Sequence, residues 1–243
     1  MPEQSRRFVV TGAAGGIGMA VAAAALREGN RVALLDRQLV TEVGDTDSLG
    51  ASVEHRLDLG TDVSDAVEVE TAFAAVSAEW GGIDVLVNCA GVAEATPVIN
   101  ADIDTWDRII ATNLRGTFLC TRAALASMVP AGSGIIVNVA SIDGLKGRAG
   151  GAAYCASKAG VVRFTESVAD EVSRHNIRVN VVCPAGVDTP MWRRHHTNDR
   201  PETVLQPAEV AATILFLCSP QSSAANGSTI ELLGPRLNWG TYL

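Results

Sequence analysis

The hydrophobic positions of the chain form short, nearly continuous runs that alternate with segments of helical spacing. Runs rich in Val, Ile and Leu predict seven strands, at residues 6–12, 31–36, 55–60, 83–91, 134–141, 177–186 and 227–234. Apolar residues that recur every three or four positions predict helices at residues 16–30, 64–80, 102–129, 152–175 and 207–219, with Ser64 as the N-cap of the second. Residues 41–53 are polar and interrupted by glycine, which indicates a loop or one short helix.

Strands that alternate with helices are typical of a parallel sheet that is covered on both faces. No change of composition and no linker marks a domain boundary. The pattern therefore predicts an α/β fold: a single doubly wound, Rossmann-type domain over residues 1–243, with a mostly parallel seven-stranded sheet.

Composition narrows the classes of protein to consider. Apolar residues make up 47% of the 243 residues, enough for a large core, and the net charge of -8 argues against a general nucleic-acid binder. The five cysteines are widely spaced without a C-x-x-C pair, so neither a disulfide framework nor a metal site is expected. The chain has no apolar run of about 18 residues and no signal-peptide pattern, so we expect no membrane association and a cytoplasmic location.

A glycine-rich turn, "TGAAGGIG" at residues 11–18, joins the first predicted strand to the first helix. Glycines let a backbone turn tightly and approach a pyrophosphate, and a helix N-terminus supplies amide donors to it. The spacing fits both Gly12-x3-Gly16-x-Gly18 and Gly12-x2-Gly15-x2-Gly18, so the glycines alone do not separate two related fingerprints. The position predicts a dinucleotide site, with a ligand-free turn as the alternative.

Asp36 ends the second strand, 18 residues after Gly18. A carboxylate at that place accepts hydrogen bonds from both ribose hydroxyls of NAD and repels the 2′-phosphate of NADP. The neighbouring Arg37 could instead pair with such a phosphate, and an aspartate at a strand end can also simply cap a turn. We predict NAD as the cofactor.

The segment "YCASK" places Tyr154 one helical turn before Lys158. A free phenol has a pKa near 10, and the positive charges of a lysine and an oxidised nicotinamide both favour the phenolate. Tyr-x-x-x-Lys alone occurs by chance in many helices. Ser141, at the exit of the fifth strand, and Asn113, in a helix expected to flank the same crevice, turn the pair into a candidate acid/base site. For Asn113 the alternative is a helix-interior amide that satisfies a local backbone bond.

Together these motifs resemble the classical short-chain dehydrogenase/reductase family over nearly the whole chain. The matching pieces are residues 11–18, Asp36, "DV" at 62–63, "NCAG" at 88–91, Asn113, Ser141, residues 154–158 and "PAGVDTP" at 184–190. The resemblance favours the Gly12-Gly16-Gly18 reading of the turn. It also implies a homotetramer or a homodimer.

The resemblance implies roles for individual residues. Asn113 would hold a water in a proton relay, Ser141 would position the substrate oxygen, Tyr154 would exchange the proton, and Lys158 would bind the nicotinamide ribose. The implied cofactor contacts are Gly12, Gly16, Ile17, Gly18, Asp36, Asp62, Val63, Asn88, Ala90, Gly91, Tyr154, Lys158, Pro184, Val187 and Thr189.

Three positions depart from the family pattern. Cys89 stands where a second Asn is frequent, Ala185 replaces a usual Gly after Pro184, and the tail after the last strand lacks Asp-Gly-Gly. The family uses that tail for subunit contacts, so the departure bears on oligomer geometry.

Residues 188–207 lie where the family has its substrate lid. They contain Trp192 and the basic run Arg193, Arg194, His195 and His196. This run could attract an anionic substrate, and the alternative is a solvated loop.

The leading hypothesis is an NAD-dependent oxidoreductase that interconverts a small-molecule secondary alcohol and a ketone, with Tyr154 as acid/base. An alternative is an NADPH-dependent carbonyl or 3-oxoacyl-thioester reductase, against which Asp36 argues. A third is a dinucleotide-binding regulatory protein without turnover, against which the set Asn113, Ser141, Tyr154 and Lys158 argues.

Overall fold

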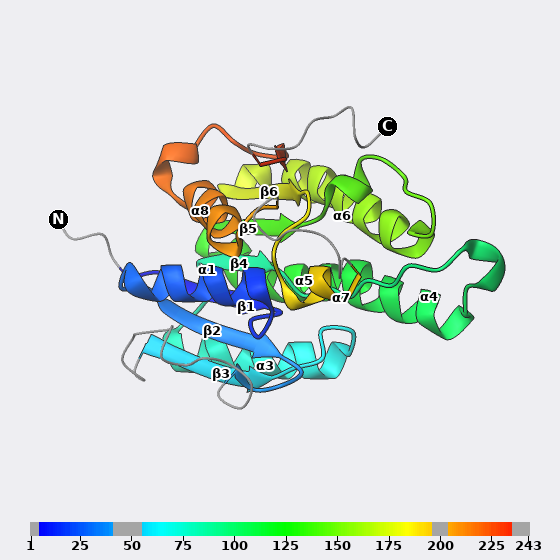
Figure 1. Cartoon of the computed structure of the whole chain (residues 1–243). Coiled ribbons are helices and arrows are strands. Elements are labelled where there is room, and N and C mark those ends of the chain that lie inside the picture. The colour runs from blue at the N-terminus through cyan, green and yellow to red at the C-terminus, as the bar shows by residue number, and fades with distance from the viewer. Residues whose placement is uncertain (1–4, 41–54, 196–203, 235–243) are drawn as a thin grey trace.

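The computed structural model describes residues 5–40, 55–195 and 204–234, and its central feature is one parallel sheet (Figure 1). The strands are β1 Arg7–Thr11, β2 Arg31–Asp36, β3 Arg56–Gly60, β4 Val85–Asn88, β5 Gly134–Val139, β6 Ile177–Pro184 and β7 Thr229–Leu232. They lie in the order β3-β2-β1-β4-β5-β6-β7, and each paired strand is parallel to its neighbour. The predicted doubly wound fold is confirmed, and the sheet formed by the described strands is entirely parallel.

Helices cover both faces of this sheet. The longer ones are α1 Gly16–Arg27, α3 Ala66–Trp80, α4 Ile103–Ile110, α5 Gly116–Ala131, α6 Ala152–Val172 and α8 Pro207–Cys218, and a short α7 spans Pro190–His195. Helices α1 and α8, blue and orange in Figure 1, pack against each other on one face. Helices α3, α5 and α6 pack against the opposite face.

The alternation of side chains along β1 explains the two layers. Phe8 and Val10 are fully buried against α1 and α8, whereas Val9 points to the cluster formed with α3 and α5. Successive residues of a strand point to opposite faces, so a strand buried on both sides must be apolar throughout. The run "RFVVT" of β1 has this character.

The chain reverses its direction of strand addition between β1 and β4. It adds β2 and β3 on one side of β1 and then returns to build β4 to β7 on the other. In doubly wound sheets the carboxyl ends of the strands at such a switch point leave a crevice for a ligand. The glycine turn after β1 and residues 89–91 after β4 therefore border the same crevice.

A buried polar network ties the centre of the sheet to the helices behind it. Asn138 is fully buried on β5; its Oδ1 accepts a hydrogen bond from Nδ2 of Asn88 on β4 at 2.8 Å, and its Nδ2 donates to Oγ1 of Thr165 on α6 at 2.8 Å. Asn88 Nδ2 also reaches Thr121 Oγ1 on α5 at 3.2 Å, while its Oδ1 has no partner among the described residues. The network fixes two helices relative to two strands.

The sequence-based boundaries are wrong at two helices. The predicted helix 102–129 is divided by a π-helical turn, Ala111–Arg115, into α4 and α5, because hydrophobic spacing does not detect one widened turn. The N-cap of α3 is Asp65 and not Ser64: the Asp65 carboxylate accepts from the amides of Val67 and Glu68 at 2.8 and 3.0 Å. The prediction for residues 41–53 lies outside the described residues.

No helix within residues 5–40, 55–195 and 204–234 is both long and apolar enough to cross a membrane.

We expect Asn138→Ala to lower the free energy of unfolding by about 2–4 kcal/mol, because it removes one hydrogen-bond partner from each of Asn88 and Thr165 in a closed interior and leaves a small cavity. Urea denaturation followed by circular dichroism measures the change. Thr71→Ala is the matched control: it removes an exposed hydroxyl that donates to the Val67 carbonyl on α3, and it should change stability by less than about 0.5 kcal/mol. A similar loss in both variants would contradict a special role for the network.

Candidate active site

The glycine turn after β1 forms a cradle with no room for side chains. A Cβ atom on Gly12 would lie 2.7 Å from Cα of Ala90, and one on Gly18 would lie 2.2 Å from the Gly12 carbonyl oxygen. Gly12 also has φ of +65°, which only glycine adopts readily. Helix α1 begins here without a side-chain cap and without an acidic residue in its first turn. Its first amides therefore remain available to an anion, and the turn fits the pyrophosphate of a dinucleotide.

Asp36 lies at the carboxyl end of β2, beside this turn. Its Oδ2 accepts a hydrogen bond from the amide of Ala14 at 3.0 Å, and its Oδ1 lies 3.4 Å from the amide of Gln38. These bonds fix the carboxylate where a ribose would follow the pyrophosphate. The side chain of Arg37 is exposed beside Asp36, and both residues line a cavity along the glycine turn.

Two adjoining cavities occupy the crevice. One, of about 390 Å³, runs along the glycine turn and the ends of β2 and β4. The other, of about 310 Å³, is bordered by Ser141, Tyr154 and Trp192. Both cavities share the residues Ile17, Cys89, Gly91, Thr189 and Met191. We call the first the dinucleotide cavity and the second the substrate cavity. A dinucleotide and a substrate bound in them would come into contact beside these shared residues.

Helix α6 and the end of β5 bring the candidate catalytic residues together. Tyr154 and Lys158 share one face of α6, with the Lys158 Nζ 5.7 Å from the centre of the Tyr154 ring. Ser141 follows β5 and hydrogen-bonds to the Tyr154 hydroxyl. Lys158 is buried, and its Nζ donates to the Val139 carbonyl at 2.8 Å. Ser141, Tyr154 and Lys158 all line the second cavity.

Asn113 lies in the π-helical turn between α4 and α5 and is fully buried. Its Oδ1 accepts from the amide of Val92 at 2.8 Å, and its Nδ2 donates to the Val92 carbonyl and to Ser157 Oγ at 2.9 and 3.0 Å. Ser157 in turn donates to the Tyr154 carbonyl at 2.7 Å. Asn113 therefore touches α6 and the loop after β4, and its side chain borders neither cavity.

The chain alone does not lower the pKa of the phenol. Burial raises the pKa of Tyr154 to about 12, and the hydrogen bond with Ser141 opposes that rise only in part. Burial also lowers the pKa of Lys158 to about 8, because an ammonium loses its hydration there. An oxidised nicotinamide bound beside Tyr154 would add a positive charge that favours the phenolate.

Most of the predicted cofactor residues border one of the cavities. The first is lined by Gly12, Gly16, Ile17, Gly18, Asp36, Asp62, Val63, Ala90, Gly91 and Thr189, and the second by Pro184 and Val187 with Tyr154 and Lys158. Asn88 borders neither and belongs to the buried network of β4 and β5. Gly91 is notable because a Cβ there would lie 3.4 Å from both Asn113 Oδ1 and Lys158 Nζ.

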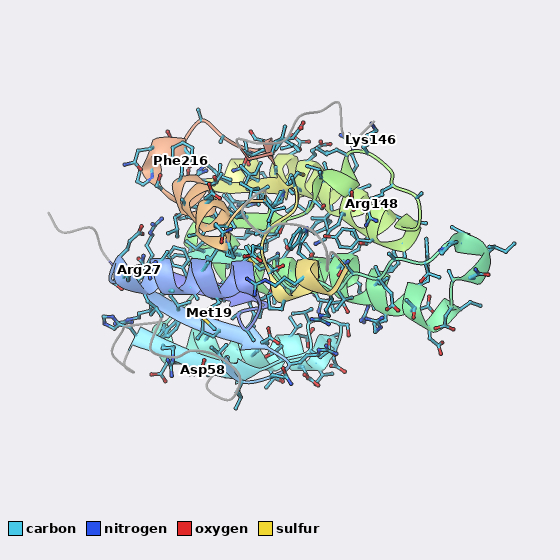
Figure 2. All side chains as sticks on the ribbon, in the orientation of Figure 1. Met19, Arg27, Asp58, Lys146, Arg148 and Phe216 are labelled. Atoms are coloured by element: carbon cyan, nitrogen blue, oxygen red, sulfur yellow. The ribbon has the colours of Figure 1, made fainter. Side chains whose placement is uncertain are left out.

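Sequence reasoning missed an ion pair in the wall of the second cavity. Arg148, labelled near α6 in Figure 2, lies 3.0 Å from Asp143, Nε to Oδ2, and both line the cavity. Asp143 lies in a 3₁₀-helical turn, Ile142–Gly144, directly after Ser141, and Arg148 lies in the connection from that turn to α6. The sequence signal that could have predicted this pair is its position between Ser141 and Tyr154.

The residues of the basic run in the predicted lid have different neighbours. Arg193 forms a bidentate ion pair with Asp188, at 2.6 and 2.9 Å, and this hydrogen bonding lowers the pKa of Asp188. Arg194 borders the dinucleotide cavity, and Trp192 borders the substrate cavity. Neither arginine lines the substrate cavity as described. The side chain of His195 and all of His196 lie outside the described residues.

We expect Lys158→Met to raise the melting temperature of the ligand-free protein at pH 7. The pKa of about 8 lies below the ordinary value of 10.5, so the folded state carries the full cost of the charged amine below pH 8, roughly 3 kcal/mol before the lost hydrogen bond is counted. That cost disappears as the pH rises from 8 toward 10.5, so the difference from wild type should narrow over this range. Thermal melts from pH 7 to 10.5 measure it.

The matched control is Lys146→Met, which changes the only other lysine of the chain, an exposed one. Any offset of its melting temperature from that of the wild type should not narrow between pH 8 and 10.5, because the side chain that it changes is exposed. A Lys158→Met difference that stays constant with pH would contradict the assigned shift.

Known proteins agree with this geometry. The chain is 36% identical over 244 residues to 2-(R)-hydroxypropyl-CoM dehydrogenase of Xanthobacter autotrophicus, which covers 95% of this chain and 98% of that protein. It is 32% identical to a 3-oxoacyl-[acyl-carrier-protein] reductase of Vibrio cholerae, over 93% of this chain and 95% of that one. Among solved structures, a single-residue variant of actinorhodin polyketide ketoreductase with NADPH superposes with a TM-score of 0.87 at 33% identity, over 95% and 96% of the two chains.

The family model described as short chain dehydrogenase matches residues 6–200, which include the glycine turn, Ser141, Tyr154 and Lys158. The family predicted from the sequence is thus confirmed. The chain belongs to the short-chain dehydrogenase family, whose members are oxidoreductases that use a nicotinamide dinucleotide.

Proposed function

We propose that the protein is an NAD-dependent oxidoreductase that interconverts a secondary alcohol and a ketone. The observation that carries the proposal is the position of Ser141, Tyr154 and Lys158 in the substrate cavity, across a shared wall from the dinucleotide cavity. The relative from Xanthobacter, whose name describes a hydroxypropyl substrate, supports a secondary alcohol.

In this proposal the nicotinamide, when bound, takes or gives the hydride, and the chain manages the proton. Ser141 holds the substrate oxygen and also hydrogen-bonds to the Tyr154 hydroxyl, so that oxygen and phenol are held close together. Tyr154 takes the proton from the alcohol or returns it to the ketone. Lys158 holds the nicotinamide ribose and keeps a positive charge beside the phenol. Asn113 supports the proton relay that the family resemblance implies, because its side chain fixes Ser157 and the loop at Val92.

Asp36 supports NAD over NADP. Its carboxylate is held by two backbone amides beside the glycine turn and would repel a 2′-phosphate. The alternative is an NADPH-dependent carbonyl or 3-oxoacyl-thioester reductase. It is favoured by the exposed Arg37 in the same cavity, by the NADPH of the ketoreductase structure and by the Vibrio relative.

We further propose a cytoplasmic homotetramer or homodimer. All five cysteines are free thiols, which suits a reducing compartment. Phe118 on α5 is 44% exposed and meets Phe164 of α6 edge to face, with ring centres 6.3 Å apart. A partly exposed aromatic pair of this kind is common at subunit contacts. Sedimentation velocity with the purified chain tests the state of assembly.

We expect Tyr154→Phe to reduce turnover about 1000-fold, because the ring remains and only the proton-carrying hydroxyl is lost. Absorbance at 340 nm with NAD and a panel of secondary alcohols, sugars, steroids and hydroxy acids measures turnover. Tyr242→Phe, at the only other tyrosine, should keep wild-type activity. Full turnover by Tyr154→Phe would refute the mechanism, and tight NADH binding without any wild-type turnover on the panel would favour a regulatory role.

We expect Asp36→Ser to move the ratio of kcat/KM for NAD over NADP at least tenfold toward NADP, since it removes the charge that opposes the 2′-phosphate but keeps an oxygen acceptor for the Ala14 amide. Arg37→Gln is the matched control and should not improve the use of NADP. A wild-type enzyme that uses only NADP would overturn the role of Asp36 and favour Arg37 as the coenzyme selector.

A further inference from the structure

The two neighbouring arginines of α7 have different electrostatic surroundings. Both nitrogens of one edge of the Arg193 guanidinium are bound to Asp188, so its charge is matched by a carboxylate. Arg194 has no carboxylate partner among the described residues; its Nε donates to the Pro190 carbonyl at 3.3 Å, one turn earlier in the same helix. That single bond holds the side-chain stem along α7 and leaves the terminal nitrogens for another acceptor.

The base of α7 lies directly against the glycine turn. A Cβ on Gly16 would lie 2.7 Å from Cγ2 of Thr189, the residue before the helix. Arg194 then borders the dinucleotide cavity together with Thr189, Pro190 and Met191. Because Thr189 and Met191 also border the substrate cavity, Arg194 approaches the dinucleotide cavity from the side that adjoins the substrate.

The charges around this cavity include no cation on the glycine turn, where a pyrophosphate would bind. Among the described residues, those that are charged and line it are Asp36, Arg37, Asp62 and Arg194. Asp36 is held by the amides of Ala14 and Gln38, and Asp62 Oδ1 accepts from the amide and hydroxyl of Ser64 at 2.8 and 2.7 Å. Arg37 follows Asp36 at the ribose end. The glycine turn itself, residues 11–18, contains no cation, so the amides of α1 are its only means of balancing a dianion.

We propose that Arg194 binds the pyrophosphate of the nicotinamide dinucleotide and thereby couples the position of α7 to coenzyme binding. This inference rests on the proposed function only in requiring that a dinucleotide occupies the cavity. Of the two arginines, Arg193 has its charge balanced by Asp188, and Arg194 supplies the positive charge that the glycine turn lacks. A guanidinium suits this task because its fork matches the geometry of phosphate oxygens.

The test measures equilibrium binding without turnover. Dissociation constants for NADH, NADPH and ADP-ribose are determined by calorimetry for the full chain at about 20 and about 200 mM salt, between which the Debye length falls from roughly 20 Å to roughly 7 Å. Arg194→Gln should weaken the binding of NADH and ADP-ribose by about tenfold at the lower salt, and by less at the higher. Equal effects on NADH and ADP-ribose exclude the nicotinamide, and a loss that shrinks at higher salt identifies an ionic contact, which leaves the pyrophosphate as the one anionic group that the two ligands share.

Arg193→Gln is the matched control, since it removes the same charge one residue away. It should change the dissociation constants of NADH and ADP-ribose less than about twofold, and Arg194→Lys, which keeps the charge, should recover at least half of the loss on a logarithmic scale. Melting temperatures without ligand, unchanged in Arg194→Gln, show that the fold is intact.

Three results would overturn the inference: Arg194→Gln binding as tightly as the wild type, Arg193→Gln weakening binding equally, or a loss confined to NADPH, which would place the contact at a 2′-phosphate. A wild-type chain that binds neither NADH nor NADPH would instead overturn the proposed function, and the inference with it. The two failures are therefore distinguishable.

Discussion

The burial of one ammonium group, that of Lys158, is the constraint around which the active site is organised. Its Nζ is held by the Val139 carbonyl at the end of β5, so the charge joins α6 to the sheet. Two neighbouring positions leave little room for a side chain. A Cβ on Gly144 would lie 2.7 Å from the Lys158 carbonyl carbon, and one on Gly91 would lie 3.4 Å from Nζ. The chain has only two lysines against seventeen arginines. An amine, unlike a guanidinium, tolerates such burial by shifting its pKa.

The architecture was predictable because its signals are local and repeated. Strands buried on both faces must be apolar nearly throughout, and the runs "RFVVT" and "RVALLD" show this pattern in the sequence. The π-helical turn at Ala111–Arg115 was not predictable, since one extra residue in a turn leaves the apolar spacing almost unchanged. The choice of Asp65 over Ser64 as an N-cap likewise depends on which side chain reaches the free amides, and both residue types cap helices well.

The candidate site was predictable where a residue type is required by its chemistry, as for Tyr154, Lys158 and the glycine turn. It was not predictable where the environment decides. Burial of Tyr154 opposes the shift expected from its lysine neighbour, and the sequence carries no measure of that burial. The Asn88 amide, for which the resemblance implies a cofactor contact, also donates within the buried network between β4 and β5, which the sequence does not indicate. Adjacent arginines, identical in the sequence, differ because only one of them faces Asp188.

Backbone hydrogen bonds join the two ends of the predicted lid. A parallel bridge pairs Val187 with Leu205; the Asp188 amide donates to the Leu205 carbonyl at 2.8 Å, and the Leu205 amide donates to the Gly186 carbonyl at 2.9 Å. These bonds hold the two ends of the segment together directly after β6. The cost of closing a loop grows only with the logarithm of its length. The stretch between α7 and Leu205 can therefore change in length at little cost to the sheet, whereas Thr189 and α7, which border the dinucleotide cavity, are held to their present sequence by the coenzyme.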